Sequence, residues 1–120
     1  MIDNCIEKIL NLVIIMKVTF LGTGTSTGIP TIGVKRESCL SSDKRDNRLR
    51  SSILIEYKSK SILIDCGPDF RQQMLRINKT KIDAIFFTHE HADHTAGLDD
   101  IRPISFPVSY THLRAHETHE

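Results

Sequence analysis

The stretch that decides the fold is Thr88-His89-Glu90-His91-Ala92-Asp93-His94, which follows the apolar run Ile82 to Phe87 directly. The imidazoles of His89, His91 and His94 and the carboxylate of Asp93 fall within six residues. His89 and His91 lie two positions apart, so an extended backbone would point both side chains to the same side. Neutral imidazole and carboxylate are the usual protein ligands of zinc, manganese or iron. The pattern therefore predicts a metal site at the end of a strand.

The spacing of these ligands also bears on the number of ions. His89 and His91 form one pair, and Asp93 and His94 form a second pair where the backbone must turn. Four ligands packed along one short loop cannot easily surround a single ion, so the spacing favours two ions. The alternative is a polar surface loop that happens to be rich in histidine. The strand-then-loop context that such a motif needs is present, which favours the metal site.

A second stretch, Gly22-Thr23-Gly24-Thr25-Ser26-Thr27-Gly28, follows the short apolar segment that begins at Met16. Small residues let backbone N–H groups approach an anion, and hydroxyl groups add further donors. Thr23, Gly24 and Ser26 are therefore candidate substrate-binding residues, although a plain tight turn explains the loop equally well. It is not a dinucleotide-binding fingerprint, because the glycine spacing differs and no helical pattern follows.

The β-branched segments between these stretches predict strands. Residues 16–22, 52–57, 61–65 and 83–87 are expected to form them, and Lys58-Ser59-Lys60 is expected to be the turn of a hairpin. Residues 29–50 show no periodicity and are expected to form a long loop.

Two helices are expected as well. Residues 69–77 place Phe70, Met74 and Ile77 on one face at helical spacing, as core residues would be. Asp69 is expected to cap this helix in the manner of a capping box with Gln72, and Asn78 is expected to end it. A second helix is expected from Thr95 to Ile101, ended by Arg102-Pro103.

Length and composition limit the classes of protein to consider. The 120 residues suggest one domain, and a net charge of +1 gives no overall attraction to nucleic acid or membrane. The basic run from Lys35 to Arg50 is expected to be a solvated loop, with an anion-steering rim as the alternative. Three widely spaced cysteines do not resemble a disulfide framework, which favours a reducing cytoplasm. No stretch is long enough to cross a bilayer.

The two ends of the chain differ in character from its centre. We expect residues 1–15 to be an extension, since Met16 looks like a natural start; the alternative is a short apolar helix packed on the domain. The domain is expected to span residues 16–107. Residues 108–120 resemble a translated adapter tail, so we expect them to be non-native and do not take His112, His116 or His119 as ligands.

Three ordered segments resemble the metallo-β-lactamase-fold superfamily: Phe20 to Ser26, Ile62 to Gly67, and Thr88 to His94. The strings Asp65 to Arg71 and Gly97 to Arg102 are similar to its cyclic-phosphate phosphodiesterase branch, which acts on phosphoribosyl cyclic phosphates. The resemblance implies an α+β or α/β fold, specifically the N-terminal half of an αββα sandwich with a mixed sheet and flanking helices.

The resemblance also implies roles for particular residues. His89 and His91 would bind a first divalent ion, and Asp93 and His94 a second, with zinc or manganese as the metal. The family's remaining ligands come from the second half of its fold, beyond residue 120. Asp93 and Asp65 would be catalytic residues, Asp65 by accepting a hydrogen bond that orients a ligand. The alternative for Asp65 is a carboxylate that only caps a turn.

One loop departs from this branch, which often holds a structural zinc with a Cys-x-Cys-x-x-Cys motif. The corresponding residues here are Val34, Arg36 and Cys39. One thiol cannot hold zinc, so we expect no structural zinc at this loop.

The expected function is a hydrolase that cleaves phosphodiesters, small cyclic ones above all, through a metal-activated hydroxide. Its partner would be the small phosphodiester substrate, with no membrane and with a homodimer allowed. One alternative is a ribonuclease Z-like endonuclease that trims tRNA 3′ ends, although that family usually has Gly where Ala92 stands. Another is that the 120-residue chain is an inactive fragment.

Overall fold

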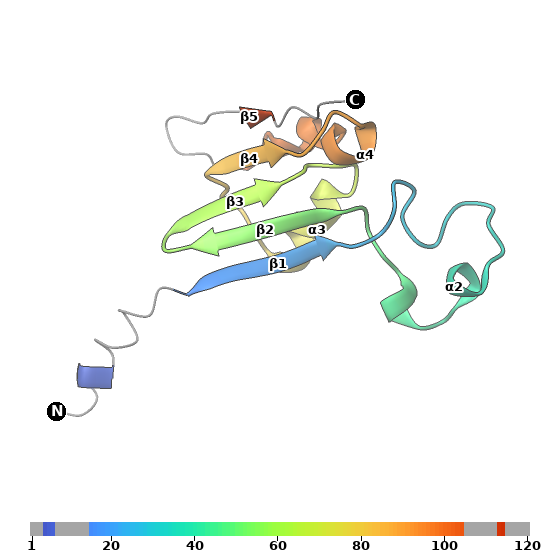
Figure 1. Ribbon diagram of the computed structural model, residues 1–120, viewed down its shortest axis with the longest axis horizontal. Coiled ribbons are helices and arrows are strands. Elements are labelled where there is room, and N and C mark those ends of the chain that lie inside the picture. Colours follow the sequence, from blue (N-terminus) through green and yellow to red (C-terminus); the bar gives the residue numbers. More distant parts are fainter. Residues whose placement is uncertain (1–3, 7–14, 105–112, 115–120) are drawn as a thin grey trace, which may run out of the picture.

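A computed structural model describes residues 4–6, 15–104 and 113–114 of the chain. Its centre is one mixed sheet with the strand order β1-β2-β3-β4-β5 (Figure 1). The strands are β1 (Met16–Gly22), β2 (Ser52–Tyr57), β3 (Lys60–Ile64), β4 (Ala84–Phe87) and β5 (Leu113–Arg114). The pairs β1–β2 and β2–β3 are antiparallel, whereas β3–β4 and β4–β5 are parallel. The α+β architecture with a mixed sheet is confirmed.

The predicted hairpin joins β2 to β3. Tyr57 pairs with Lys60, and Lys58 in the turn has a φ of 53°. Along the strands the buried residues alternate with less buried ones, so that Leu54 and Leu63 lie on one face of the sheet. This period of two is what a strand imposes on its side chains.

Helix α3 (Phe70–Ile77) covers that face and lies behind the sheet in Figure 1. Phe70 and Met74 are buried in the core, and Ile77 packs against it, as the helical spacing predicted. The rest of the core comes from the strands β1 to β4 and from the segments next to them. These buried residues are Leu21, Leu54, Leu63, Cys66, Ile82 and Ile85. Asn78 ends α3 in the left-handed conformation, with a φ of 52°.

Two local predictions are wrong. Asp69 is the N-cap residue of α3, as predicted, but the predicted capping box is absent, because its carboxylate accepts hydrogen bonds from the backbone N–H and the guanidinium of Arg50. The continuous helix expected from Thr95 to Ile101 is replaced by two short pieces, α4 (Ala92–Thr95) and η2 (Leu98–Ile101). Gly97 separates them, because its backbone is pressed against that of Gly67.

The long loop after β1 is irregular, as expected, apart from α2 (Glu37–Leu40) and the 3₁₀ turn η1 (Lys44–Asp46). The predictions for residues 1–15 and for His112, His116 and His119 fall almost entirely outside the described residues. Within the described part of the chain, none of the helices has the length and apolar character that crossing a membrane requires.

Candidate metal centre

The histidine-rich loop lies where two parallel strands end side by side. Asp65 follows β3 and Thr88 follows β4, and the N–H of Asp65 donates to the carbonyl of Phe86 at 2.8 Å. Two more backbone bonds, each 2.8 Å long, join the loops beyond the strands: Cys66 N–H to the His94 carbonyl, and Gly97 N–H to the Cys66 carbonyl. Backbone hydrogen bonds therefore hold the two loops together, in addition to any contacts between their side chains.

Asp65 lies beneath the histidine loop and is buried. Its Oδ1 accepts the backbone N–H of Thr88 at 2.8 Å, and its Oδ2 accepts the Thr88 hydroxyl at 2.8 Å and His94 Nδ1 at 2.7 Å. Its φ of 63° is uncommon for a residue with a side chain. Asp65 therefore lies where it can fix the ring of His94, and its effect on a bound metal stays a prediction.

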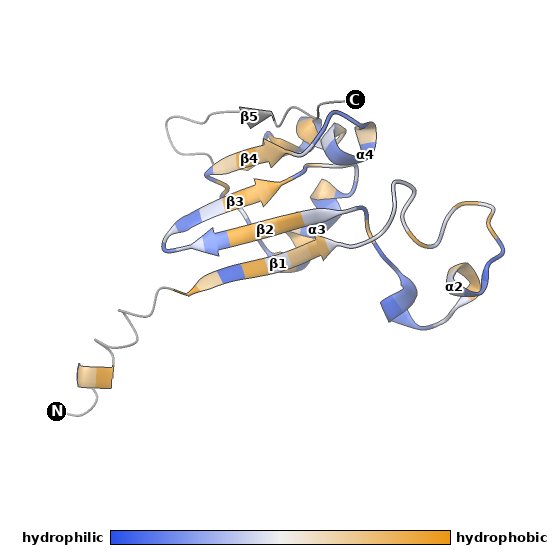
Figure 2. Cartoon of the chain, viewed as in Figure 1, coloured by the Kyte–Doolittle hydropathy of each residue, from blue (hydrophilic) through white to orange (hydrophobic). Residues whose placement is uncertain are grey.

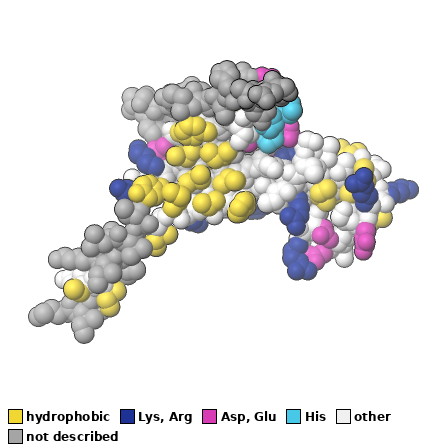
Figure 3. All heavy atoms as spheres, in the orientation of Figure 1, with side chains coloured by type: hydrophobic (Ala, Val, Ile, Leu, Met, Phe, Trp, Pro, Cys, Tyr) yellow, Lys and Arg dark blue, Asp and Glu magenta, His cyan; other side chains and the backbone are white. Residues whose placement is uncertain are grey.

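The structure brings the four predicted ligands together. The ring centroids of His89 and His91 are 4.6 Å apart, and those of His89 and His94 are 4.0 Å apart. His94 Nε2 lies 3.1 Å from Asp93 Oδ2. Figure 3 shows the histidine side chains gathered at one end of the sheet, beside acidic side chains.

The chemistry of these donors suits a cation. Asp65 Oδ2 lies 2.7 Å from His94 Nδ1 and can accept an N–H bond from it, and Nε2 of the same ring lies on the side of Asp93. A ring nitrogen and a carboxylate oxygen 3.1 Å apart are close enough to share one cation, either a proton or a metal ion. Among the described residues, however, no three His, Cys, Asp or Glu side chains are already arranged to hold a metal ion.

The glycine loop is tied to a different part of the chain. Arg48 donates to the Thr23 hydroxyl at 3.0 Å, Gly24 N–H donates to the Leu49 carbonyl at 2.7 Å, and Arg50 Nε donates to the Ser26 carbonyl at 2.7 Å. In the described part of the chain, none of the hydrogen bonds of Thr23, Gly24 and Ser26 reaches a histidine. Their role in substrate binding remains a prediction.

Arg50 is a positioning residue that the sequence did not reveal. Its guanidinium pairs with Asp69 at 3.0 Å while its Nε holds the glycine loop, and its carbonyl accepts from Gln73 of α3 at 3.0 Å. Nothing in the sequence distinguishes Arg50 from the other basic residues of the run that begins at Lys35. Thr88 was also missed as a partner of Asp65, although a hydroxyl placed directly after a strand was a usable signal.

Cys66 is fully buried, as predicted for a small core residue. Burial raises the pKa of its thiol to about 12, with a further contribution from the negative charges of Asp100 and Asp65. A thiol that stays protonated at neutral pH cannot act as the nucleophile of the site.

Cys39 is the single thiol of the loop that corresponds to the structural-zinc loop of related proteins. The N–H of Thr31 lies 3.5 Å from Cys39 Sγ, which is within range of a weak hydrogen bond to sulfur. The cysteine therefore has a local partner inside its own loop.

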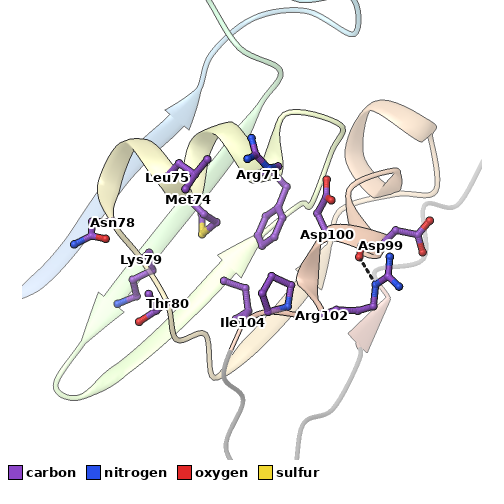
Figure 4. Close-up of a pocket in the computed structure, with 12 residues that line it drawn as sticks. Arg71, Met74, Leu75, Asn78, Lys79, Thr80, Asp99, Asp100, Arg102 and Ile104 are labelled. Carbon is purple, nitrogen blue, oxygen red and sulfur yellow. Dashed lines mark hydrogen bonds between the residues drawn. The ribbon is translucent and has the colours of Figure 1, made fainter.

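A separate hollow of about 360 Å³ lies between α3 and η2 (Figure 4). Phe70, Met74 and Ile104 are among its apolar residues, and Arg71 and Arg102 are among its charged ones. None of the predicted metal ligands lines this hollow. It is thus distinct from the histidine cluster.

Comparison with known proteins identifies the family. The profile of the Beta-lactamase superfamily domain matches residues 60–119. Ribonuclease Z of Methanococcus aeolicus is 38% identical over 85 residues, which are 69% of this chain and 21% of that protein. A protein of Porphyromonas gingivalis named octanoyltransferase is 51% identical over 90 residues, which are 74% of this chain and 18% of that protein. The match takes up less than a fifth of this second protein.

Comparison with solved structures points to the same family. A diphosphatase from the PhnP family superposes with a TM-score of 0.77 and 42% identity, over 85% of this chain and 51% of that one. Zn²⁺-bound PqqB from Methylobacterium extorquens superposes with a TM-score of 0.65 and 25% identity, over 77% of this chain and 36% of that one. The chain thus spans about half of the first structure and about a fifth of the two curated relatives. On its sequence and its fold together, the chain belongs to the beta-lactamase superfamily and has the fold of the metallo-β-lactamase hydrolases.

Proposed function

We propose that the histidine cluster is the metal-binding part of a hydrolase that cleaves phosphodiester bonds, with small cyclic phosphates as substrates. The observation that carries this proposal is the cluster itself: His89, His91 and His94 lie together beside Asp93, and Asp65 holds the ring of His94 from below. A surface loop that was histidine-rich by chance would not need a buried carboxylate to orient one of its rings.

In this proposal His89 and His91 hold one divalent ion and Asp93 and His94 hold another, with zinc or manganese as the metal. The similar PqqB structure is Zn²⁺-bound, which supports zinc. Such ions, when bound, make water a better nucleophile at neutral pH and offset negative charge on phosphate oxygens.

The chain's own residues contribute orientation and hydrogen bonds. Asp65 lies 2.7 Å from His94 Nδ1 and would hold a proton there, which would leave Nε2 as the donor atom for a metal. Thr23 accepts a hydrogen bond from Arg48, so its hydroxyl proton is available to an anionic oxygen, and the Arg48 guanidinium adds positive charge. Thr23, Gly24 and Ser26 would therefore bind the phosphate from the side of the glycine loop.

Small substrates are favoured over tRNA by the likeness to a diphosphatase at 42% identity. A second candidate function, endonucleolytic cleavage of precursor tRNA, is supported by the likeness to ribonuclease Z at 38% identity. The three cysteines are free, which supports a reducing compartment such as the cytoplasm for either function.

The test begins with the metal. Zinc and manganese are titrated into the purified chain by calorimetry, and Asp93→Asn is compared with Asp99→Asn, an exposed carboxylate outside the cluster. We expect the first variant to lose at least about tenfold in zinc affinity and the second to be unchanged. Equal zinc affinities for the two variants would show that the histidine loop is not the metal site.

Activity is then measured on a ribose cyclic phosphate and on a precursor tRNA, with the metal-loaded chain. Cleavage of the cyclic phosphate alone is the expected result. Cleavage of the tRNA alone would support the second candidate function. A chain that binds metal but cleaves neither substrate would support the third hypothesis, that this polypeptide has no activity of its own.

A further inference from the structure

Two arginines, Arg48 and Arg50, stand two positions apart in the segment that leads into β2, which Figure 2 shows as mostly hydrophilic. Both donate to the glycine loop: Arg48 Nη1 to the Thr23 hydroxyl at 3.0 Å, and Arg50 Nε to the Ser26 carbonyl at 2.7 Å. Side chains two positions apart in an extended segment point to the same side. The two guanidinium groups therefore lie along one side of the glycine loop, although their surroundings differ.

The charge of Arg50 is balanced within the chain. Its Nη1 lies 3.0 Å from Asp69 Oδ1, and its backbone N–H donates to Asp69 Oδ2 at 2.8 Å. Only 28% of the Arg50 side chain and 16% of the Asp69 side chain are exposed, so salt and water screen this ion pair less than a pair at the surface. The Arg50 carbonyl is held as well, by Gln73 Nε2 of α3 at 3.0 Å. Arg50 therefore has a fixed place between α3 and the glycine loop.

The glycine loop takes its position from this segment. Gly24 N–H donates to the Leu49 carbonyl at 2.7 Å, and Gly24 pairs with Arg50 in an isolated parallel bridge. A Cβ on Gly24 would lie 2.6 Å from the Arg48 carbonyl oxygen, which is closer than such atoms approach one another. The backbone of the loop thus lies directly against the segment, and a displacement of Arg50 would move the loop with it.

Asp69 connects this arrangement with the histidine cluster. It stands four residues after Asp65, in the same loop that follows β3. Asp65 Oδ2 lies 2.7 Å from His94 Nδ1, whereas Asp69 holds Arg50. One short segment therefore carries both the carboxylate beneath the histidine loop and the carboxylate that anchors the glycine loop, which fixes the two loops relative to each other.

Arg48 differs from Arg50 in that its charge is not balanced. Its side chain is exposed, and among the residues that the structure describes no Asp or Glu forms an ion pair with it. The Thr23 hydroxyl accepts from Arg48 and keeps its own proton for another acceptor. A guanidinium and a hydroxyl donor side by side suit a phosphate oxygen.

Building on the proposed function, we propose that the two arginines have different tasks at the site. Arg48 binds a phosphate oxygen of the substrate together with Thr23, and Arg50, neutralised by Asp69, positions the glycine loop. Arg48 is thus a substrate-binding residue, whereas Arg50 and Asp69 are positioning residues that hold the phosphate-binding donors at a fixed place relative to the histidine cluster.

The binding role is tested by titrating inorganic phosphate into the metal-free 120-residue chain and following the backbone amide resonances of the glycine loop by NMR. We expect binding with a dissociation constant on the order of millimolar. Arg48→Gln should weaken it at least about tenfold, because a charged hydrogen-bond donor is lost, and Arg48→Lys should restore part of the affinity. Arg45→Gln is the matched control, since Arg45 belongs to the same basic run but is 89% exposed and paired with Asp43.

The positioning role is tested without any ligand, by hydrogen exchange of the Gly24 amide. Arg50→Gln and Asp69→Asn should each raise its exchange rate at least about tenfold, because the bond to the Leu49 carbonyl opens more often. The double variant should exchange about as fast as either single variant, since both substitutions remove one contact. Arg45→Gln should leave the rate unchanged. The amides of β2 and β3 serve as the reference for global unfolding.

Each role can fail on its own. Phosphate that leaves the glycine-loop resonances unmoved, or that binds Arg48→Gln and Arg45→Gln equally well, would show that Arg48 is not a phosphate-binding residue. An unchanged Gly24 exchange rate in Asp69→Asn would show that the ion pair does not position the loop. Neither test involves a metal ion, so a histidine loop that fails to bind zinc would count against the proposed function alone.

Discussion

Asp65 shows how much one side chain can organise in this protein. It is held at a φ of 63° and accepts three hydrogen bonds, two from Thr88 and one from His94. Backbone strain at a functional site persists when the surroundings over-determine it. Here two sets of hydrogen bonds hold Asp65 in this conformation. Its N–H donates to the Phe86 carbonyl, and its carboxylate accepts the bonds from Thr88 and His94.

Asp65→Asn tests this role without disturbing the backbone, because asparagine also tolerates the left-handed region. The amide keeps one acceptor but turns an N–H₂ group toward the donors of Thr88 or His94. We expect a loss of about 1–3 kcal/mol in the free energy of unfolding and a loss of about 10–100-fold in zinc affinity. Urea unfolding and zinc titration measure the two effects. Asp99→Asn is the control, and an Asp65→Asn protein that matches it in both assays would contradict the role.

Cys66 yields a pH-dependent prediction. Its thiol pKa rises from 9.0 when unfolded to about 12 in the folded protein, chiefly because the thiolate would be buried. The folded state therefore retains the proton over a range where the unfolded chain loses it. The stabilisation that Cys66 contributes is complete below pH 9 and is lost as the pH rises from about 9 to about 12.

The measurement compares urea unfolding at pH 8 and pH 10 for the natural chain and for Cys66→Ala. Other groups titrate in both proteins, so the difference between them isolates the thiol. We expect the natural chain to lose more stability between the two pH values than the variant does. Identical losses would show that Cys66 is not buried as the structure has it.

At the scale of elements, the site depends on how closely two loops approach. A Cβ on Gly97 would lie 2.0 Å from the Gly67 carbonyl oxygen and 2.8 Å from Phe70 Cβ. Only a residue without a side chain lets the loop after α4 reach the loop after β3. The short helices α4 and η2 are therefore shaped by this contact, and not by helix propensity.

Gly97→Ala should cost about 3 kcal/mol in the free energy of unfolding, at the upper end of the usual overpacking range. Gly33→Ala is the matched control, since a Cβ there would meet nothing within 4 Å and only the φ of 77° opposes it. That variant should lose about 1–2 kcal/mol. Both are measured by urea unfolding, and a Gly97→Ala protein as stable as Gly33→Ala would show that the two loops are not in contact.

At the scale of the molecule, the described core is one cluster between α3 and the sheet. Leu63 lies at its centre, on the strand that pairs with both β2 and β4. Leu63→Ala should cost about 2–5 kcal/mol, and Leu75→Ala on the exposed side of α3 less than about 0.5 kcal/mol. Helical and tyrosine circular dichroism should report one coincident urea transition. Separate transitions, or equal losses in the two variants, would argue against a single core.

Much of this protein followed from local sequence pattern. The strands, the hairpin turn, the core face of α3 and its end at Asn78 were predictable because alternation, helical spacing and turn residues act over a few positions. That His89, His91, Asp93 and His94 lie close together was predictable for the same reason, since they occupy one loop; their role as metal ligands stays a prediction. What only the tertiary structure decided were contacts between distant segments: Asp69 with Arg50, Thr88 and His94 with Asp65, and Gly97 with Gly67. These contacts depend on which strands end side by side, and β3 and β4 come to lie in parallel only once the crossover through α3 has brought the chain back to the same sheet.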